Sequence, residues 1–213
     1  DVSAGKWVGG WKKPVGNEVM GKTLGIIGMG RIGKEVAIRA RAFGMKVIAF
    51  NRTFDADFAA EHNIQQGASA QDVLESADII SLHCMLTPET RNLIDAEQIS
   101  RLKDGVLVVN CARGEVINSE DVAAALASGK IGGFAADVLD AEPPAADHPL
   151  LNAPNTIITA HIASRTHESV QRQANRCLNN LINFFDKTIL IFTICCVCIH
   201  IMLLDYFVVT NIL

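Results

Sequence analysis

The sequence lacks the features that would place it in several common functional classes. Its 19 basic and 23 acidic residues give a net charge of −4 without a basic cluster, so nucleic-acid binding is not indicated. The opening stretch, residues 1–21, is polar and glycine-rich and does not resemble a secretory signal. A G-x-S-x-G motif is absent, and residues 1–187 hold no cluster of metal ligands. Serine-hydrolase chemistry and a metal site therefore have no support.

Cysteines are few over most of the chain. Cys84, Cys111 and Cys177 are widely spaced, which is typical of reduced thiols in a cytosol-like compartment, and we expect a cytoplasmic protein. The 213 residues are enough for one sizeable domain, or for one domain and a fragment of another.

The last stretch, residues 188–213, differs in composition from the rest. It contains no Ala, Gly, Pro, Lys, Arg or Glu, yet it holds half of the six cysteines. A transmembrane helix is one interpretation, but Asp205 interrupts the apolar run before it reaches the ~20 residues that a bilayer requires. A zinc site is another, but Cys195 and Cys198 have no second cysteine pair. We favour an artefactual or read-through tail, because residues with A/T-rich codons dominate it; we expect no membrane association unless the tail is genuine.

The clearest pattern in the sequence is a strand–helix–strand unit near its start. Apolar runs at 23–27 and 46–50 predict two buried parallel strands. Between them stands a G-x-G-x-x-G motif, formed by Gly28, Gly30 and Gly33. In this context the first glycine permits a tight turn, the second lets the backbone approach a pyrophosphate, and the third lets helix and strand pack closely. The unit therefore predicts a dinucleotide-binding site.

The helix of this unit is expected to follow the glycine motif and to end at Gly44. Its N-terminal N–H groups and positive dipole end would face the anionic pyrophosphate. Ile32, Val36, Ala40 and Phe43 recur at helical spacing, and we predict that they form one apolar face.

Strands and helices continue to alternate along the chain. Apolar runs predict strands at 79–82, 106–110, 133–138 and 156–159, and a weak strand near residue 64. Capping patterns predict helix starts at Ser69, Thr87-Pro88, Asp95, Ser119 and Thr166. This alternation predicts an α/β fold with a doubly wound parallel sheet, that is, a Rossmann-type domain.

Polar side chains follow the predicted strands at the edge where such sheets bind ligands. Arg113 offers a guanidinium fork that suits a carboxylate, Glu142 lies in a proline-rich loop, and His161 follows the last strand. Taken singly, each could be an ordinary surface side chain. Together, a histidine that exchanges protons near neutral pH, a carboxylate that orients it and an arginine that holds an acid are what oxidation of a 2-hydroxy acid requires.

Five segments in sequence order carry a resemblance to a known family. They are GKTLGIIGMGRIGKEVA, SLHCMLTPET, NCARGEVI, DVLDAEPP and TAHIAS. They resemble the D-isomer-specific 2-hydroxyacid dehydrogenases, of the phosphoglycerate dehydrogenase or hydroxypyruvate/glyoxylate reductase type, and the resemblance covers about residues 5–187. It implies that Arg113 binds the substrate carboxylate and carbonyl, that His161 is the acid/base, and that Glu142 is its partner.

The resemblance also implies where a nicotinamide dinucleotide binds. Arg31 and Ile32 would contact the pyrophosphate, and Asp137 would contact the nicotinamide amide. The other positions with implied cofactor contacts are Asn51, at the adenosine ribose, and Cys84, Cys111 and Ser164. His83 and Thr87 lie near Cys84 in the sequence. A structural role and a functional role are equally well supported for each of them.

The chain departs from the family pattern in residues that bear on the cofactor. Asn51 stands where NAD-dependent members carry Asp, whose charge repels a 2′-phosphate. Arg52 follows and can contact that phosphate, with the Thr53 hydroxyl as a second donor. We therefore expect NAD(P) as the cofactor, with NADP favoured over NAD. Met85 replaces a proline that is usual in the family, which concerns only the local loop geometry.

A further departure concerns the substrate domain. The resemblance implies a substrate domain built from both chain ends, and we expect its N-terminal part, with a loop that grips the substrate carboxylate, to be missing from these residues. We expect a linker and helix end at 1–21, an NAD(P)-binding Rossmann domain at 22–165, a returning helix of the incomplete substrate domain at 166–187, and the atypical tail at 188–213.

Two hypotheses for the function follow. The first is an oxidoreductase, a homodimer, that transfers a hydride between NAD(P) and a small D-2-hydroxy or 2-oxo acid of the phosphoglycerate, hydroxypyruvate or glyoxylate type. The alternative is a non-catalytic dinucleotide-binding module or an inactive fragment, since the same fold serves corepressors that sense dinucleotides.

Overall fold

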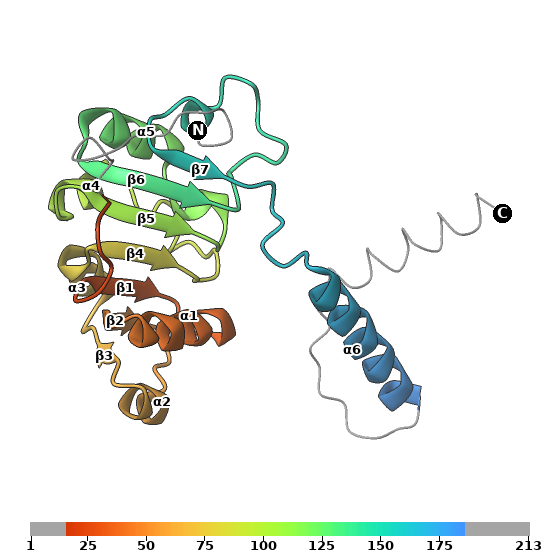
Figure 1. Cartoon of the computed structure of the whole chain (residues 1–213). Helices are drawn as coiled ribbons and strands as arrows, with labels where there is room; N and C mark the ends of the chain where they lie inside the picture. The colour runs from red at the N-terminus through yellow and green to blue at the C-terminus, as the bar shows by residue number, and fades with distance from the viewer. Residues whose placement is uncertain (1–15, 186–213) are drawn as a thin grey trace, which may run out of the picture. The chain divides into compact units, whose positions relative to one another are not determined.

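A computed structural model describes residues 16–185 of the chain (Figure 1). These residues fall into two compact units, one that ends at Ala160 and one that begins at His161. The hypotheses about the tail, and most of the expected linker at 1–21, fall outside the described residues.

The first unit is built on a seven-stranded parallel sheet with the order β3-β2-β1-β4-β5-β6-β7 (Figure 1). The direction of this order reverses between β1 and β4, and ligands of such sheets bind beyond the strand ends at that point. The predicted doubly wound parallel sheet is therefore confirmed. Its strands are β1 (Thr23–Ile27), β2 (Lys46–Phe50), β3 (Gln65–Gln66), β4 (Ile79–Leu82), β5 (Val106–Asn110), β6 (Ile131–Ala136) and β7 (Thr156–Ile158).

The helices of this unit follow the predicted alternation. Two of them begin at the predicted caps, because Ser69 Oγ accepts the N–H of Asp72 at 3.1 Å and Asp95 Oδ1 accepts the N–H of Gln98 at 2.9 Å. The helices are α1 (Arg31–Ala42), α2 (Ala56–Glu61), α3 (Ala70–Ser76), α4 (Ala96–Arg101) and α5 (Ser119–Ser128), and the two short 3₁₀ turns are η3 (Gly114–Val116) and η4 (Pro149–Leu151).

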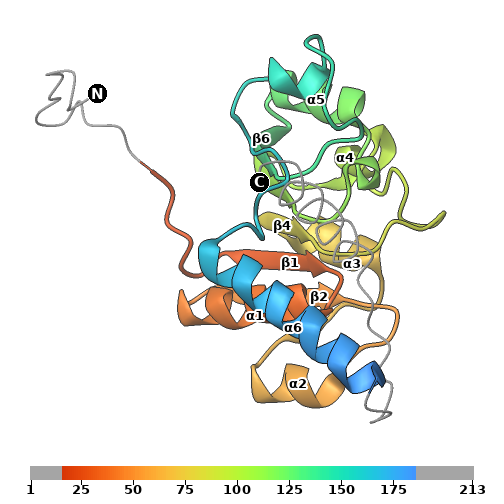
Figure 2. The same ribbon diagram turned by 90° about the vertical axis from the view of Figure 1, so that its right-hand side faces the viewer.

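Two apolar layers lie on opposite faces of the sheet, because neighbouring residues of a strand point to opposite sides. Ile26 packs in one layer with Ala37 of α1 and with residues of α2. Ile27 packs in the other layer with Leu74 of α3 and Val122 of α5. Figure 2 shows α1 alongside β1 and β2, with α2 toward one end of the sheet and α5 toward the other. Packing on both faces of the sheet therefore holds the carboxyl ends of the strands in place, and the predicted site residues follow these ends.

The prediction for the buried face of α1 was partly wrong. Gly33, Ala37 and Ala40 are its buried residues, whereas Ile32 is 61% exposed and Phe43 is 68% exposed. Only small side chains fit where α1 packs closely on the sheet. These small residues lie on a different face of the helix from Ile32 and Phe43. Ile32 is consequently exposed near the start of the helix.

Two other local predictions were also wrong. Thr87 and Pro88 begin a turn and not a helix: the Thr90 hydroxyl accepts the N–H of Thr87 at 2.8 Å and donates to the Met85 carbonyl at 2.7 Å. These side-chain bonds satisfy the backbone locally and compete with a helix. The strand predicted at 133–138 begins and ends two residues earlier, as β6, and leaves Asp137 just past the strand end.

The second unit contains the helix α6 (His167–Phe185), which begins one residue after the start predicted at Thr166. Thr166 Oγ1 accepts the N–H of Ser169 at 3.1 Å, so the predicted start carries a side-chain cap. Val170, Leu178 and Leu181, which are apolar residues of this helix, are between 44% and 46% exposed. Within residues 16–185 no helix is long and apolar enough to cross a membrane.

Candidate active site

The three glycines of the loop after β1 have different surroundings. Gly28 has a φ of +102°, and a Cβ there would lie 2.5 Å from the His83 carbonyl carbon. A Cβ at Gly33 would lie 2.1 Å from the Gly28 carbonyl oxygen. A Cβ at Gly30 would meet no protein atom within 4 Å. Gly28 and Gly33 are therefore required for packing, whereas Gly30 faces open space.

The N-terminus of α1 is suited to an anion. Its N-cap residue, Gly30, supplies no side-chain hydrogen bond, and its first turn contains no acidic residue. Arg31 and Ile32 stand exposed at this end, and Lys34 pairs with Asp55. Free N–H groups at a helix N-terminus and the helix dipole together favour a phosphate. The geometry thus fits the pyrophosphate site predicted from the glycine motif.

The Asn51 side chain is held within the loop after β2. Its Oδ1 accepts the N–H of Met29 at 3.2 Å, and its Nδ2 donates to the Thr53 carbonyl at 2.5 Å. Arg52 and Thr53 are exposed next to it. The pKa of the Glu89 carboxyl lies below its usual value, through a hydrogen bond from Thr87, its own backbone and the charge of Arg52. Asn51 therefore ties the loop after β2 to the glycine loop, and Arg52 is the cation beside it.

His83, Cys84 and Cys111 come directly after β4 and β5, and their surroundings favour the uncharged forms of all three side chains. Burial lowers the pKa of His83, whose Nε2 lies 2.8 Å from Ser81 Oγ. Burial raises the pKa of the Cys84 thiol. Burial and the neighbouring charge of Asp137 raise the pKa of the Cys111 thiol. These two cysteines are therefore largely protonated near neutral pH and unsuited to act as nucleophiles.

Arg113 follows β5 and is held by its neighbours. The fully buried Asn110 donates from Nδ2 to the Arg113 carbonyl at 2.9 Å and accepts the Ala112 N–H on Oδ1 at 3.0 Å. The Arg113 side chain donates from Nη1 to the Ala112 carbonyl at 2.7 Å, and the residue is exposed. An exposed guanidinium on a fixed backbone can bind a carboxylate.

Asp137 and Glu142 both follow β6. The Asp137 N–H donates to the Asn110 carbonyl at 3.1 Å, and the Thr159 hydroxyl donates to Asp137 Oδ1 at 2.6 Å. Glu142 is exposed, and its Oε1 accepts the Leu139 N–H at 3.1 Å. Asn110 therefore links the Arg113 and Asp137 positions on two neighbouring strands.

His161 and Ser164 belong to the second unit. His161 has a φ of +53°, and the other non-glycine residues with positive φ in the described chain are asparagines, which tolerate this region better. Strained backbone of this kind gathers at functional sites. The grouping of His161 with Arg113 and Glu142 stays a prediction, as does the cofactor contact of Ser164.

Within the first unit, the predicted residues from the glycine motif to Glu142 follow the carboxyl ends of β1, β2, β4, β5 and β6, so they share one edge of the sheet. The sequence interpretation missed Asn110, Gly114 and Thr159 as supporting residues. A polar residue at the end of an apolar strand was the available signal for Asn110. In the described part of the chain, no group of three or more His, Cys, Asp or Glu side chains could hold a metal ion.

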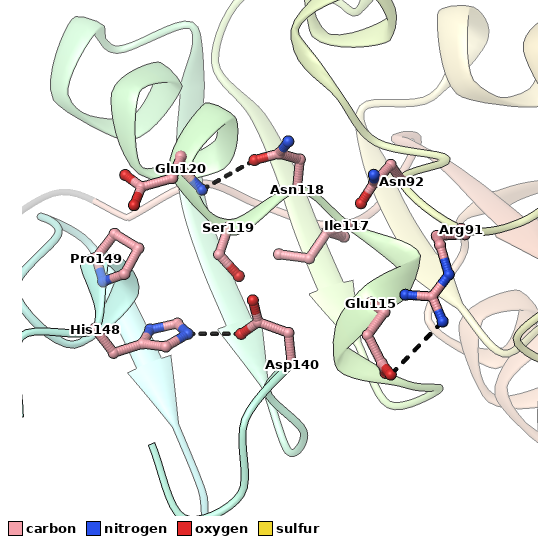
Figure 3. A pocket seen from close by; sticks show the side chains of 10 residues that line it. All are labelled: Arg91, Asn92, Glu115, Ile117, Asn118, Ser119, Glu120, Asp140, His148 and Pro149. Carbon is pink, nitrogen blue, oxygen red and sulfur yellow. Dashed lines mark hydrogen bonds and ion pairs between the residues drawn. The ribbon is translucent and has the colours of Figure 1, made fainter. Parts of the chain in front are cut away.

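A pocket of about 240 Å³ opens beside the loops that follow β4, β5 and β6 (Figure 3). Arg91 and Glu115 line it with their side-chain Nη2 and Oε1 atoms 3.9 Å apart. Asp140 and His148 line another part of it and are hydrogen-bonded to each other. Neither pair was predicted from the sequence.

The glycine loop, the parallel sheet and its strand order together define a dinucleotide-binding domain. The sequence profile of the D-isomer specific 2-hydroxyacid dehydrogenase NAD-binding domain matches residues 1–163. The chain belongs to this family, and the predicted resemblance is confirmed.

Particular relatives agree with this assignment. A glyoxylate reductase of Korarchaeum cryptofilum is 40% identical over 86% of this chain and 55% of the relative. A D-3-phosphoglycerate dehydrogenase of Bacillus subtilis is 42% identical over 80% of this chain and 32% of the relative. The crystal structure of a glyoxylate reductase from Paecilomyes thermophila superposes with a TM-score of 0.80 and 37% identity, over 91% of this chain and 58% of that one. The chain thus spans about half the length, or less, of these proteins.

Proposed function

We propose that the protein carrying this chain is an NAD(P)-dependent oxidoreductase that transfers a hydride between the cofactor and a small D-2-hydroxy or 2-oxo acid. The observation that carries the proposal is the placement of Arg113 and Glu142 at the sheet edge that also bears the glycine loop. Arg113 would hold the substrate carboxylate, and His161, oriented by Glu142, would take the hydroxyl proton as the hydride leaves. The relatives named above act on glyoxylate or phosphoglycerate, as their names state, and we extend this substrate class to this protein.

The cofactor would supply the hydride acceptor and donor. Gly30 leaves room for its pyrophosphate, and the α1 N-terminus would face the charge. Asp137, fixed by the Thr159 hydroxyl, would accept a hydrogen bond from the nicotinamide amide. A homodimer and a cytoplasmic location stay predictions.

Steady-state oxidation of NADH and NADPH by the complete gene product tests the proposal. We expect oxidation that depends on glyoxylate, hydroxypyruvate or phosphohydroxypyruvate. Binding of dinucleotide without turnover of any of these acids would instead support the alternative, a non-catalytic dinucleotide-binding module.

We predict that NADP(H) binds more tightly than NAD(H). Asn51 carries no charge to repel a 2′-phosphate, its amide is held by Met29 and Thr53, and the exposed Arg52 can contact the phosphate. Glu89 partly offsets the Arg52 charge. We therefore expect NADP(H) to bind about tenfold more tightly than NAD(H), which corresponds to one charge-assisted hydrogen bond.

Fluorescence titration of the protein with NADPH and NADH measures this preference. Arg52→Ala should weaken NADPH binding with little effect on NADH, and Asn51→Asp should reverse the preference. Arg101→Ala is the matched control, since Arg101 is an exposed arginine that pairs with Glu97 on α4. Tighter NADH binding that Arg52→Ala leaves unchanged would show that the prediction is wrong.

A further inference from the structure

Asp140 and His148 close the base of the loop that carries Glu142. Asp140 Oδ1 and His148 Nε2 are 2.7 Å apart, although the two residues are eight positions apart in the sequence (Figure 3). The His148 side chain is 7% exposed and that of Asp140 is 41% exposed. Glu142 lies between them in the sequence, so its loop is joined at both ends by this bond.

The hydrogen bonds of His148 fix its tautomer. The Leu150 N–H donates to Nδ1 at 3.3 Å, so Nδ1 carries no proton and the ring N–H is at Nε2, where it donates to Asp140. Burial alone would raise the pKa of Asp140, but the hydrogen bond from His148 holds it below its ordinary value. The Ser119 hydroxyl and the Asp140 carboxylate point toward each other in Figure 3. Asp140 therefore remains a carboxylate that accepts the imidazole N–H near neutral pH.

The start of the same loop touches the backbone next to Arg113. A Cβ at Gly114 would lie 1.9 Å from the Leu139 carbonyl carbon and 2.1 Å from the Asp140 nitrogen, so these backbones are in direct contact. The Leu139 N–H in turn donates to Glu142 Oε1 at 3.1 Å. A displacement of Asp140 would therefore move the group that holds the Glu142 carboxylate.

We propose that the Asp140–His148 pair, here named the loop latch, positions Glu142 for the proton transfer. The proposal rests on the proposed function, because it assigns a role to Glu142 in that reaction. The latch residues act through Glu142 and are positioning residues. A misplacement of about 1 Å at a catalytic group can lower turnover by about 10²-fold, so a hydrogen bond that fixes the loop base has a measurable effect.

Two substitutions of His148 separate the two hydrogen bonds of its ring. His148→Gln places an amide donor near the Nε2 position and keeps the bond to Asp140. His148→Asn places an acceptor near the Nδ1 position and keeps the bond from Leu150 but not the latch. In the complete gene product we expect His148→Asn to lower kcat by about tenfold or more with dinucleotide affinity unchanged, and His148→Gln to stay within about threefold of the unsubstituted enzyme.

A double-mutant cycle with Glu142→Gln distinguishes positioning from general loss of structure. If the latch acts through Glu142, His148→Asn should lower kcat much less in the Glu142→Gln background than in the unsubstituted enzyme. Asp104→Asn is the control. Asp104 precedes β5 and accepts a hydrogen bond from Lys130 that is also 2.7 Å long, but it is not part of the loop that carries Glu142. Equal losses from His148→Asn in both backgrounds, or equal losses from the Gln and Asn variants, would overturn the latch.

The cycle also separates the latch from the function on which it rests. Loss of activity in Glu142→Gln together with full activity in His148→Asn would reject the latch alone. Full activity in both Glu142→Gln and His161→Ala would reject the proposed catalytic roles, and the latch with them.

Discussion

Replacement of His161 by alanine is expected to lower the turnover of the complete protein by about a hundredfold or more while dinucleotide binding survives. The imidazole is the group proposed to move the hydroxyl proton, whereas backbone, ribose and pyrophosphate contacts hold the dinucleotide. The unusual φ of +53° at His161 is consistent with a side chain that the fold presents for a function.

Turnover and dinucleotide titration of the same preparation measure the two effects separately. His167→Ala is the matched control, because His167 is also an exposed histidine of the second unit and begins α6. Unchanged turnover in His161→Ala would remove His161 from its role. A loss of similar size in His167→Ala would mean that the effect is not specific to the proposed base.

Substitution of the loop glycines should separate cofactor binding from folding. Gly30→Ala is expected to weaken dinucleotide binding by about tenfold or more without lowering the melting temperature, because its Cβ would meet no protein atom but would occupy the space proposed for the pyrophosphate. Gly33→Ala should weaken binding and also destabilise the protein by about 1–3 kcal/mol, because its Cβ would lie 2.1 Å from the Gly28 carbonyl oxygen.

Thermal unfolding and NADPH titration of each variant test this difference. Gly16→Ala is the control, since a Cβ at Gly16 also meets nothing within 4 Å and lies outside the glycine motif. Normal NADPH affinity in Gly30→Ala would place the pyrophosphate elsewhere. Normal stability in Gly33→Ala would contradict the close approach of α1 to the β1 turn.

Local signals in the sequence were enough to predict most elements of the fold. Ser69 and Asp95 cap their helices through side-chain bonds to residues three positions ahead, so their effect is visible in a short window. The buried face of α1 was not predictable in the same way. Helical spacing favoured Ile32 and Phe43, but the distance between helix and sheet, which is a tertiary property, selects the small side chains of Gly33, Ala37 and Ala40.

Some residues of the candidate site could likewise be predicted from local sequence, whereas others depend on tertiary structure. Arg113 and Glu142 could be predicted from their motifs and from their positions after predicted strands, and the structure places both after strands of the sheet. The latch between Asp140 and His148 could not, because the bond depends on how a proline-rich loop closes on itself. The contact of Gly114 with Leu139 likewise depends on the spacing of two neighbouring strands.

Oxidation of the two enantiomers of one 2-hydroxy acid tests the central claim most directly. The complete gene product is incubated with D-glycerate or L-glycerate and with NAD⁺ or NADP⁺, and formation of the reduced dinucleotide is followed by absorbance. Because the chain belongs to a D-isomer specific family, we predict that D-glycerate reduces the dinucleotide and that L-glycerate gives no reduced dinucleotide above background. Turnover of L-glycerate would contradict a D-2-hydroxyacid dehydrogenase built on Arg113, Glu142 and His161. Turnover of neither enantiomer would contradict it if glyoxylate, hydroxypyruvate and phosphohydroxypyruvate also failed to oxidise the reduced dinucleotide under conditions where the dinucleotide binds.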